Sequence, residues 1–480
     1  MARRAGAFQK VRIRRRITVS LSVIVTTVLC LGYVAGDLYD VLPGVLTFDE
    51  VERTTATEPR TVISASKVVE NLDSSIAVDA SAAQRLIDEF VATEGIGGSY
   101  SIAIADAKGE IVAESGVDEK RVPASTMKTL TAYAAASTLD MGKTMATETY
   151  LEQYQDGTAN VVLKGNGDML LGSGQSDGAH VNGRAGLGTL AEETATALKQ
   201  RGIKSVTLLY DDSMFGDDRW PDGVSELDPD HVYYAPTASM AVDGGRYWNG
   251  SEPSDPDVFS SYPELSTQPA LEAAQTFRQR LEEQGITVTN LEEGTAPEES
   301  SPIAEVESAS LSEVMAFMMR HSDNSLAEEF GRLLALETGD DNSPEGAVKA
   351  VKQVLQQSGI SINGLTMLNC SGLASGSKTT VRTLLDVQQR NLQEGAGAAA
   401  AEGLSIVGFI GTAAGRLDDD GEAGLIRVKT GSLGNVTAMT GNVSRSNGGA
   451  LSFAVIVNDP DDMQSAKDAI DAFVAGLPRL

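Results

Sequence analysis

The sequence of 480 residues is poor in the side chains that most often serve as nucleophiles, bases and metal ligands. It has two cysteines, Cys30 and Cys370, and three histidines, His180, His231 and His321. A thiolate-rich or imidazole-rich metal site needs more ligands than these, and a Ser-His-Asp triad has few candidate bases. Because Cys30 lies in an apolar run near the N-terminus, no disulfide is expected beyond that run. Lysine is therefore the expected base for any serine chemistry, and neither a metal nor another cofactor is predicted.

Positive charge is also scarce. The chain has 38 Lys and Arg residues against 67 Asp and Glu residues, a formal net charge of −29. This balance excludes nucleic acid and anionic membrane surfaces as general partners. Residues 1–16 are the exception, because their charged residues are all basic: Arg3, Arg4, Lys10, Arg12, Arg14, Arg15 and Arg16. We interpret this segment as a cytoplasmic flank.

A long uncharged run follows the basic segment. Residues 17–35 have no charged side chain, and we predict a transmembrane segment at 17–36. The positive-inside rule then places the rest of the chain outside the cytoplasm. An uncleaved single-pass anchor is favoured, although Val34-Ala35-Gly36 has the small residues of a signal-peptide cleavage site, which would give a secreted protein. Residues 37–78 are mixed and polar, and we interpret them as a spacer.

The two ends of the remaining chain predict one antiparallel sheet. After a helix at 81–92, two apolar runs at 101–105 and 110–113 flank an Asp-Ala-Lys-Gly turn. Near the C-terminus three runs have hairpin spacing and precede a terminal helix at 463–477: 425–431, 436–443 and 451–457. Helical periodicity recurs between them at 310–320, 325–336, 343–357 and 380–392. We predict an α+β domain, made of 79–140 and 302–480, in which helices flank this sheet.

Residues 141–301 have a different texture, with short alternating strands and glycine-rich turns. Helices are predicted at 189–201 and 269–284, with a strand at 205–210 between them. We interpret this region as an inserted, smaller mixed α/β domain. Its aromatic residues, Trp220, Tyr233 and Tyr234, are assigned to packing within the insertion rather than to a ligand groove.

The centre of the chain is the stretch Pro123-Ala124-Ser125-Thr126-Met127-Lys128. Pro123 suits the first turn of a helix, and residues 126–139 are good helix material. Side chains three apart lie on one helical face, so Ser125 and Lys128 should point the same way. A serine hydroxyl needs a neighbour that takes its proton, and a lysine held neutral by burial does so. Alone, this motif is weak evidence, since many helices begin with a capping serine.

Two further motifs make the serine–lysine pair informative. Ser322-Asp323-Asn324 stands between two predicted helices, and Lys429-Thr430-Gly431 ends a predicted strand. Singly, the first is more often a helix cap and the second an edge-strand lysine. In this order and these contexts, however, the three motifs are the signature of serine β-lactamases and penicillin-binding proteins.

The chain resembles the low-molecular-mass D-alanyl-D-alanine carboxypeptidase/endopeptidases, whose large insertion separates the first two motifs. The resemblance extends over most of residues 81–480, and further family-like stretches are Gly165-Asn166-Gly167-Asp168, Asp211-Asp212-Ser213, Ser371-Gly372-Leu373, and Gly411-Thr412 before Gly415-Arg416-Leu417. One departure is Asn369-Cys370, where the family usually has Asp-Gly. The resemblance implies a β-lactamase/DD-peptidase-like fold, peptidoglycan stem peptides as substrates and β-lactams as inhibitors.

The resemblance also implies roles for individual residues. Ser125 would attack the penultimate D-alanine carbonyl, and Lys128 would take its proton. Ser322 would relay a proton to the leaving nitrogen, while Asn324 would hold the substrate amide and hydrogen-bond Lys128.

The third motif would bind the end of the substrate. Lys429 would supply positive potential for the terminal carboxylate and help to keep the base neutral, and Thr430 would bind that carboxylate. The backbone N–H groups of Ser125 and Ser432 would form the oxyanion hole. Gly431 is expected to be glycine because the substrate lies against that strand edge.

Two other functions remain open at this stage. A class A β-lactamase deacylates with a glutamate in a Glu-x-x-Leu-Asn pattern, and no glutamate between Asn324 and Lys429 begins that pattern. We therefore expect the acyl-enzyme formed with a penicillin to deacylate slowly, so that penicillins inhibit the protein. The second alternative is a catalytically inactive, membrane-anchored penicillin-binding scaffold.

Overall fold

The computed structural model describes residues 26–28, 31–34, 75–154, 158–298, 300–393, 395, 397–417 and 424–480. Two units are distinguished, Met1–Asn71 and Leu72–Leu480. The predicted basic segment 1–16 and most of the predicted segments 17–36 and 37–78 lie outside the described residues. In the first unit, residues 26–28 and 31–34 are helical. Among the described residues, no helix has the length and hydropathy needed to cross a membrane.

The second unit contains the predicted antiparallel sheet. Its six strands run in the order β10-β11-β12-β13-β1-β2, every neighbouring pair antiparallel. The strands are β1 (Tyr100–Asp106), β2 (Ile111–Ser115), β10 (Ser405–Ile406), β11 (Ile426–Leu433), β12 (Val436–Ser444) and β13 (Ala450–Asn458). The pairing of β1 with β13 joins the two ends of the unit and confirms the expected sheet.

Helices cover both faces of this sheet, so β13 is buried along its whole length and its sequence is almost entirely apolar. On one face lie α2 (Ala80–Val91) and α12 (Met463–Gly476), which pack on the sheet through a continuous apolar core. A second core lies on the other face, under α3 (Lys128–Ala136), α8 (Asn324–Thr338), α9 (Pro344–Gln357) and α10 (Val381–Asn391). The α+β class predicted from the sequence is therefore observed.

Helix α7 (Leu311–His321) leads directly into α8 and begins with the predicted capping box. The backbone N–H of Glu313 donates to Ser310 Oγ, and the backbone N–H of Ser310 donates to Glu313 Oε2 at 3.0 Å. Each side chain thus satisfies an N–H group that the first helical turn leaves free. The short helix α11 (Ala398–Glu402) lies beside α7 and α3.

A separate five-stranded sheet lies in the inserted region, in the order β8-β6-β4-β3-β9. Its strands are β3 (Ala146–Gln153), β4 (Ala159–Gly165), β6 (Ser205–Asp211), β8 (Thr287–Glu293) and β9 (Ala304–Glu307). The pairs β4–β6 and β6–β8 are parallel and the others antiparallel, which matches the mixed α/β interpretation. Helices α4 (Leu187–Gln200) and α6 (Pro269–Glu283) pack on it with a core of their own. Its last strand, β9, follows residue 301.

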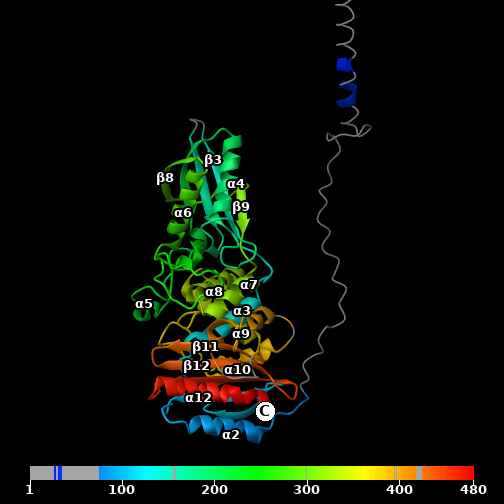
Figure 1. Ribbon diagram of the computed structural model, residues 1–480, viewed down its shortest axis with the longest axis vertical. Helices are drawn as coiled ribbons and strands as arrows, with labels where there is room; N and C mark the ends of the chain where they lie inside the picture. The colour runs from blue at the N-terminus through cyan, green and yellow to red at the C-terminus, as the bar shows by residue number, and fades with distance from the viewer. Residues whose placement is uncertain are drawn as a thin grey trace, which may run out of the picture. The chain divides into compact units, whose positions relative to one another are not determined.

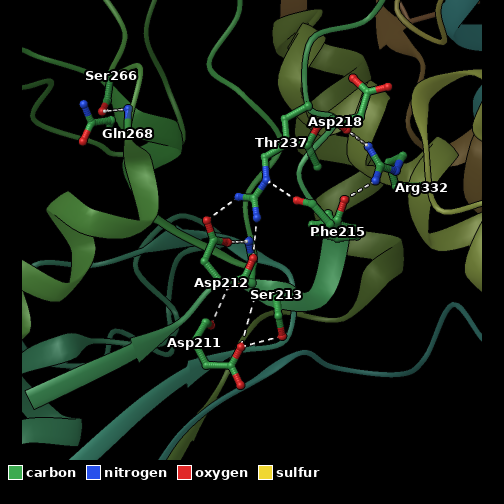
Figure 2. A network of polar contacts seen from close by, with 12 residues as sticks. Asp211, Asp212, Ser213, Phe215, Asp218, Thr237, Ser266, Gln268 and Arg332 are labelled. Atoms are coloured by element: carbon green, nitrogen blue, oxygen red, sulfur yellow. Dashed lines mark hydrogen bonds and ion pairs between the residues drawn. The ribbon is translucent and has the colours of Figure 1, made fainter. Parts of the chain in front are cut away.

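Within residues 72–480, the two sheets lie at opposite ends, with α3, α7 and α8 between them (Figure 1). The loops that follow β6 reach α8 and are fixed there by Arg332, whose side chain is buried. Figure 2 shows this guanidinium between the backbone carbonyls of Phe215 and Asp218, and it also donates to Asn342. A short parallel pair, β5 (Asp168–Leu171) with β7 (Met240–Val242), lies in the same region. The insertion is therefore bound to the helix that carries the second motif.

Two carboxyl groups, one on β5 and one on α8, are buried and interact electrostatically. Asp168 and Glu329 are each 1% exposed, and Asp168 Oδ2 and both carboxyl oxygens of Glu329 have no hydrogen-bond partner in the protein. Burial raises the pKa of Asp168 to about 7. Burial, and then the charge on Asp168, raise the pKa of Glu329 well above its ordinary value. Both carboxyl groups thus favour the protonated form in the folded protein.

We expect Asp168→Asn to stabilise the protein at alkaline pH. The folded pKa exceeds the unfolded one, so the wild type loses stability as pH rises from about 4 to about 7, and the loss is complete above that. Asparagine does not titrate and keeps an acceptor for Leu170 N. The gain in unfolding free energy should be about 2–4 kcal/mol at pH 8 and about 2 kcal/mol smaller at pH 5. Urea denaturation at both pH values measures it. Equal gains at the two pH values would contradict the explanation, and Asp217→Asn, at an exposed position, is the control.

Candidate active site

Ser125 and Lys128 lie on the turn that begins the α3 region. The sequence predicts one helix over 126–139; the structure has a 3₁₀ turn, η1 (Ala124–Met127), and then α3 from Lys128 to Ala136. Side chains three apart nearly eclipse in a 3₁₀ turn. Lys128 Nζ accordingly lies 3.1 Å from Ser125 Oγ. Ser125 is half-buried, whereas the Lys128 side chain is fully buried.

The second motif lies at the junction of α7 and α8. Ser322 ends α7 in the left-handed conformation (φ 58°), and Asp323 caps α8 by accepting from the backbone N–H of Leu326. This sharp turn directs Asn324 towards the first motif, where its Oδ1 accepts from Lys128 Nζ at 2.6 Å. The third acceptor around Lys128 Nζ is the carbonyl oxygen of Ser371, at 2.9 Å.

The third motif lies on β11. Lys429 Nζ donates to Ser322 Oγ at 2.9 Å and to the carbonyl of Thr430 at 3.0 Å. The hydroxyl of Thr430 lies 2.7 Å from that of Thr412, and the side chain of Ser432 is exposed at the cleft. The structure therefore brings together all five predicted catalytic residues and the predicted binding strand.

Gly431 has a structural reason to be glycine in addition to the predicted approach of the substrate. A Cβ atom on Gly431 would lie 2.8 Å from the carbonyl oxygen of Pro123 and 3.2 Å from the backbone nitrogen of Thr126. The serine-bearing turn η1 thus packs directly on β11 at this point, and any side chain would push the nucleophile away from the strand. The constraint comes from the protein's own backbone.

Burial lowers the pKa of both lysines, because neither ammonium group has bulk water around it. The pKa of Lys128 falls to about 7, opposed by the nearby carboxylates of Asp323 and Glu328. The pKa of Lys429 falls well below its ordinary value, through burial and then through the charge on Lys128. Repulsion between like charges is mutual, so near neutral pH the two lysines favour one shared positive charge. The sequence-based role for Lys429 included its effect on the pKa of Lys128 but not the reverse effect of Lys128 on Lys429.

The loop 369–373 completes the surroundings of Lys128, and sequence reasoning missed how it is held. The fully buried carboxyl group of Glu328 accepts from the backbone N–H groups of Cys370 at 3.0 Å and Ser371 at 2.8 Å. These bonds orient the Ser371 carbonyl towards Lys128. Asn369 accepts from Gly372 N through Oδ1 and donates to two backbone carbonyls through Nδ2, which an aspartate at this position cannot do.

A cleft of about 1000 Å³ opens over these groups. Its lining includes the large side chains of Leu227, Tyr233 and Tyr262, and Thr412 and Arg416 lie among its polar residues. The assignment of Tyr233 to packing within the insertion is wrong, since its ring is half-exposed in the cleft while its neighbour Tyr234 is buried. Two adjacent tyrosines in a sequence carry no signal that indicates which side chain is exposed and which is buried.

Gly372→Ala should displace the serine-bearing turn. Gly372 has φ +83°, and a Cβ there would lie 2.1 Å from the carbonyl oxygen of Ala124. Backbone strain and overpacking together should cost about 2–4 kcal/mol and slow acylation of Ser125. Thermal unfolding and stopped-flow acylation measure the two effects. Gly285→Ala is the matched control, with φ +80° and no atom within 4 Å of the added Cβ; equal losses in both variants would contradict the packing argument.

An antiparallel sheet covered by helices, a serine and lysine on one turn, a Ser-x-Asn turn and a Lys-Thr-Gly strand define the class of penicillin-recognising active-site-serine enzymes. The model of the D-Ala-D-Ala carboxypeptidase 3 (S13) family matches residues 83–258 and 262–477. The chain therefore belongs to this family.

Individual relatives agree with the family assignment. Carboxypeptidase DacB of Mycolicibacterium smegmatis is 33% identical over 373 residues, 76% of each chain. The D-alanyl-D-alanine carboxypeptidase of an Actinomadura species is 24% identical over 78% of this chain and 80% of its own. Penicillin-binding protein 4 (dacB) from Haemophilus influenzae shares the fold, with a TM-score of 0.67 at 20% identity over 84% of this chain and all of its own. That protein has also been solved with a β-lactam.

Proposed function

We propose that the chain is a serine D-alanyl-D-alanine carboxypeptidase, with DD-endopeptidase activity as its second reaction, that acts on peptidoglycan stem peptides and is inhibited by β-lactams. Family membership supports this assignment. The observation that carries it is the position of Lys128 Nζ, buried between Ser125 Oγ and Asn324 Oδ1 with a pKa of about 7. A lysine with that pKa is partly neutral at physiological pH and accepts the proton of the serine.

In the proposed reaction, Ser125 Oγ attacks the carbonyl carbon of the penultimate D-alanine and gives its proton to Lys128. The tetrahedral intermediate collapses, the bond to the terminal D-alanine nitrogen breaks, and that nitrogen receives a proton relayed through Ser322. An acyl-enzyme on Ser125 remains. Water then attacks the ester carbonyl, releases the shortened peptide as its carboxylic acid and restores the serine hydroxyl.

Substrate binding is assigned to β11 and its neighbours. The hydroxyl of Thr430 binds the terminal carboxylate, Lys429 supplies positive potential for it, and Asn324 holds the substrate amide. The N–H groups of Ser125 and Ser432 form the oxyanion hole, which contributes about 2.7–4 kcal/mol per donor in other hydrolases.

Slow β-lactam deacylation is proposed rather than β-lactamase activity. The described residues that line the cleft include no glutamate. Both carboxyl oxygens of Glu328 accept hydrogen bonds, from the backbone N–H groups of Cys370 and Ser371. Glu328 is also buried and does not line the cleft, so it is out of reach of a deacylating water there.

The location and domain boundaries are proposed on the sequence alone. The basic segment 1–16 followed by the uncharged segment 17–36 supports a membrane anchor, with the catalytic part outside the cytoplasm. The peptidase domain is assigned to 79–140 and 302–480 and the inserted domain to 141–301. Membrane fractionation with protease accessibility in cells tests the topology: recovery of an intact, protease-protected chain in the cytosol would contradict it.

The proposed function is tested with a diacylated L-lysyl-D-alanyl-D-alanine tripeptide and the purified protein. We expect release of one D-alanine per peptide, lost after preincubation with benzylpenicillin. Rapid hydrolysis of a chromogenic cephalosporin would instead establish a β-lactamase. Absence of both D-alanine release and a penicilloyl adduct would establish the inactive scaffold.

A further inference from the structure

The second catalytic motif is held almost entirely by the insertion. From residue 321 to residue 325, every side chain except that of Ser322 contacts the insertion. His321 Nε2 lies 3.0 Å from the carbonyl of Asp257, and Asp323 pairs with Arg246. Asn324 Nδ2 donates to the carbonyl of Tyr233, and Ser325 Oγ accepts from the N–H of Ala235. Ser322 alone faces Lys429. The insertion thus holds the motif on both sides of Ser322, while Ser322 contacts Lys429 and Asn324 also contacts Lys128.

Among the described residues, Arg246 makes the one side-chain ion pair to this motif, and its own position is fixed by further contacts. Its side chain is 6% exposed and that of Asp323 10%. A second bond to Asp243 Oδ1 at 3.1 Å and one to the Asp243 carbonyl at 2.9 Å orient the guanidinium. Its Cζ atom lies over the ring of Phe259, 4.7 Å from the ring centre, and that ring also stacks on His321. The geometry is that of a preorganised, nearly dry pair.

The partner of Arg246 lies close to the proposed base. The charged groups that act on Lys128 are Asp323 at the α7–α8 turn, Glu328 on α8 and Lys429 on β11. The two carboxylates raise the pKa of Lys128, against burial. The guanidinium of Arg246, paired with Asp323, opposes the effect of that carboxylate, because the pair presents little net charge to Lys128.

We propose that Arg246 is a positioning residue of the peptidase, which acts through Asp323 to hold the Ser322–Asn324 turn in register and to offset its negative charge so that Lys128 serves as the base. This inference rests on the proposed function. It gives the insertion a role in the chemistry, since Arg246 lies in the insertion and influences the proton affinity of Lys128 in the first motif.

The test variant is Arg246→Met, which keeps an apolar stem beside Phe259 and removes the charge. With Asp323 uncompensated, Lys128 holds its proton more tightly, and the acid limb of the benzylpenicillin acylation rate should move to higher pH by about one unit. Below the limb the rate then falls about tenfold relative to the wild type. The double variant Arg246→Met with Asp323→Asn removes both charges and should restore the wild-type limb. The turn is kept, because asparagine caps a helix as well as aspartate does.

Two controls separate this role from loss of structure. Arg219→Met removes another partly buried arginine of the insertion, whose side chain bonds Asp212 and the carbonyl of Gly216 rather than the motif; it should lower the melting temperature without moving the limb. Arg246→Lys keeps the charge and should keep the limb. If Arg246→Met does not fold, Arg246→Gln is measured with the same expectations. An unmoved limb in the variant that folds, an equal shift in Arg219→Met, or no rescue in the double variant overturns the proposal.

A second readout is independent of activity. With ¹³C-lysine labelling, NMR titration of the Cε resonances follows the pKa of Lys128, assigned by its absence in Lys128→Ala. The pKa should rise in Arg246→Met and return in the double variant. If the wild type forms no penicilloyl adduct, the proposed function fails, and this titration alone decides the role of Arg246: a pKa unchanged in Arg246→Met refutes it.

Discussion

Ser125→Ala is expected to abolish the penicilloyl adduct and to lower D-alanine release about 10⁶-fold, which is below detection in an ordinary assay. Among the described residues, the hydroxyl removed is the only one that hydrogen-bonds Lys128 Nζ, whose other partners are Asn324 Oδ1 and the carbonyl of Ser371. In the part of the chain that the structure describes, no other nucleophile is therefore aligned with the base. Intact-protein mass spectrometry after benzylpenicillin, followed by peptide mapping, measures the adduct directly.

The matched control for this prediction is Ser137→Ala at the end of the same helix. Ser137 Oγ is bonded to the carbonyl of Tyr133, away from the cleft. This variant should form a full equivalent of adduct on the peptide that contains Ser125. An adduct that persists in Ser125→Ala, on any other residue, would show that the nucleophile has been assigned wrongly.

The elements of the peptidase part could be predicted from the sequence because local and global preferences agree there. The runs around Val428, Met439 and Val455 alternate with clear turns, and they form β11, β12 and β13 as expected. The three motifs were informative for the same reason. Each fixes a side chain at a helix turn, a helix junction or a strand, and the fold then brings these places together.

What could not be predicted depends on contacts between segments far apart in the chain. Glu328 is one polar residue among several on α8, and nothing in its surroundings in the sequence indicates that it binds the N–H groups of a loop more than forty residues later. The Arg246–Asp323 pair spans 77 positions. The clash that fixes Gly431 is with the backbone of η1, which a strand pattern cannot reveal.

Lys128→Ala is expected to lower the acylation rate constant about 10²–10⁴-fold, the usual contribution of a general base. The change also strips a buried donor from Asn324 Oδ1 and the Ser371 carbonyl, so thermal unfolding is measured beside the rate. Lys349→Ala, an exposed lysine paired with Asp340 on the protein surface, should leave the rate unchanged. A rate loss in that control would point to a general effect of lost charge.

Lys128→Arg distinguishes a base from a mere positive charge at this position. Arginine stays protonated in proteins, so it keeps the charge and cannot accept the serine proton. If Lys128 is the base, the arginine variant should be as slow as the alanine variant. The wild-type rate should fall about tenfold for each pH unit well below the Lys128 pKa of about 7, and neither variant should show that limb. An arginine variant with near wild-type acylation would reassign the proton transfer to another group, and Lys429, bonded to Ser322, is the next candidate.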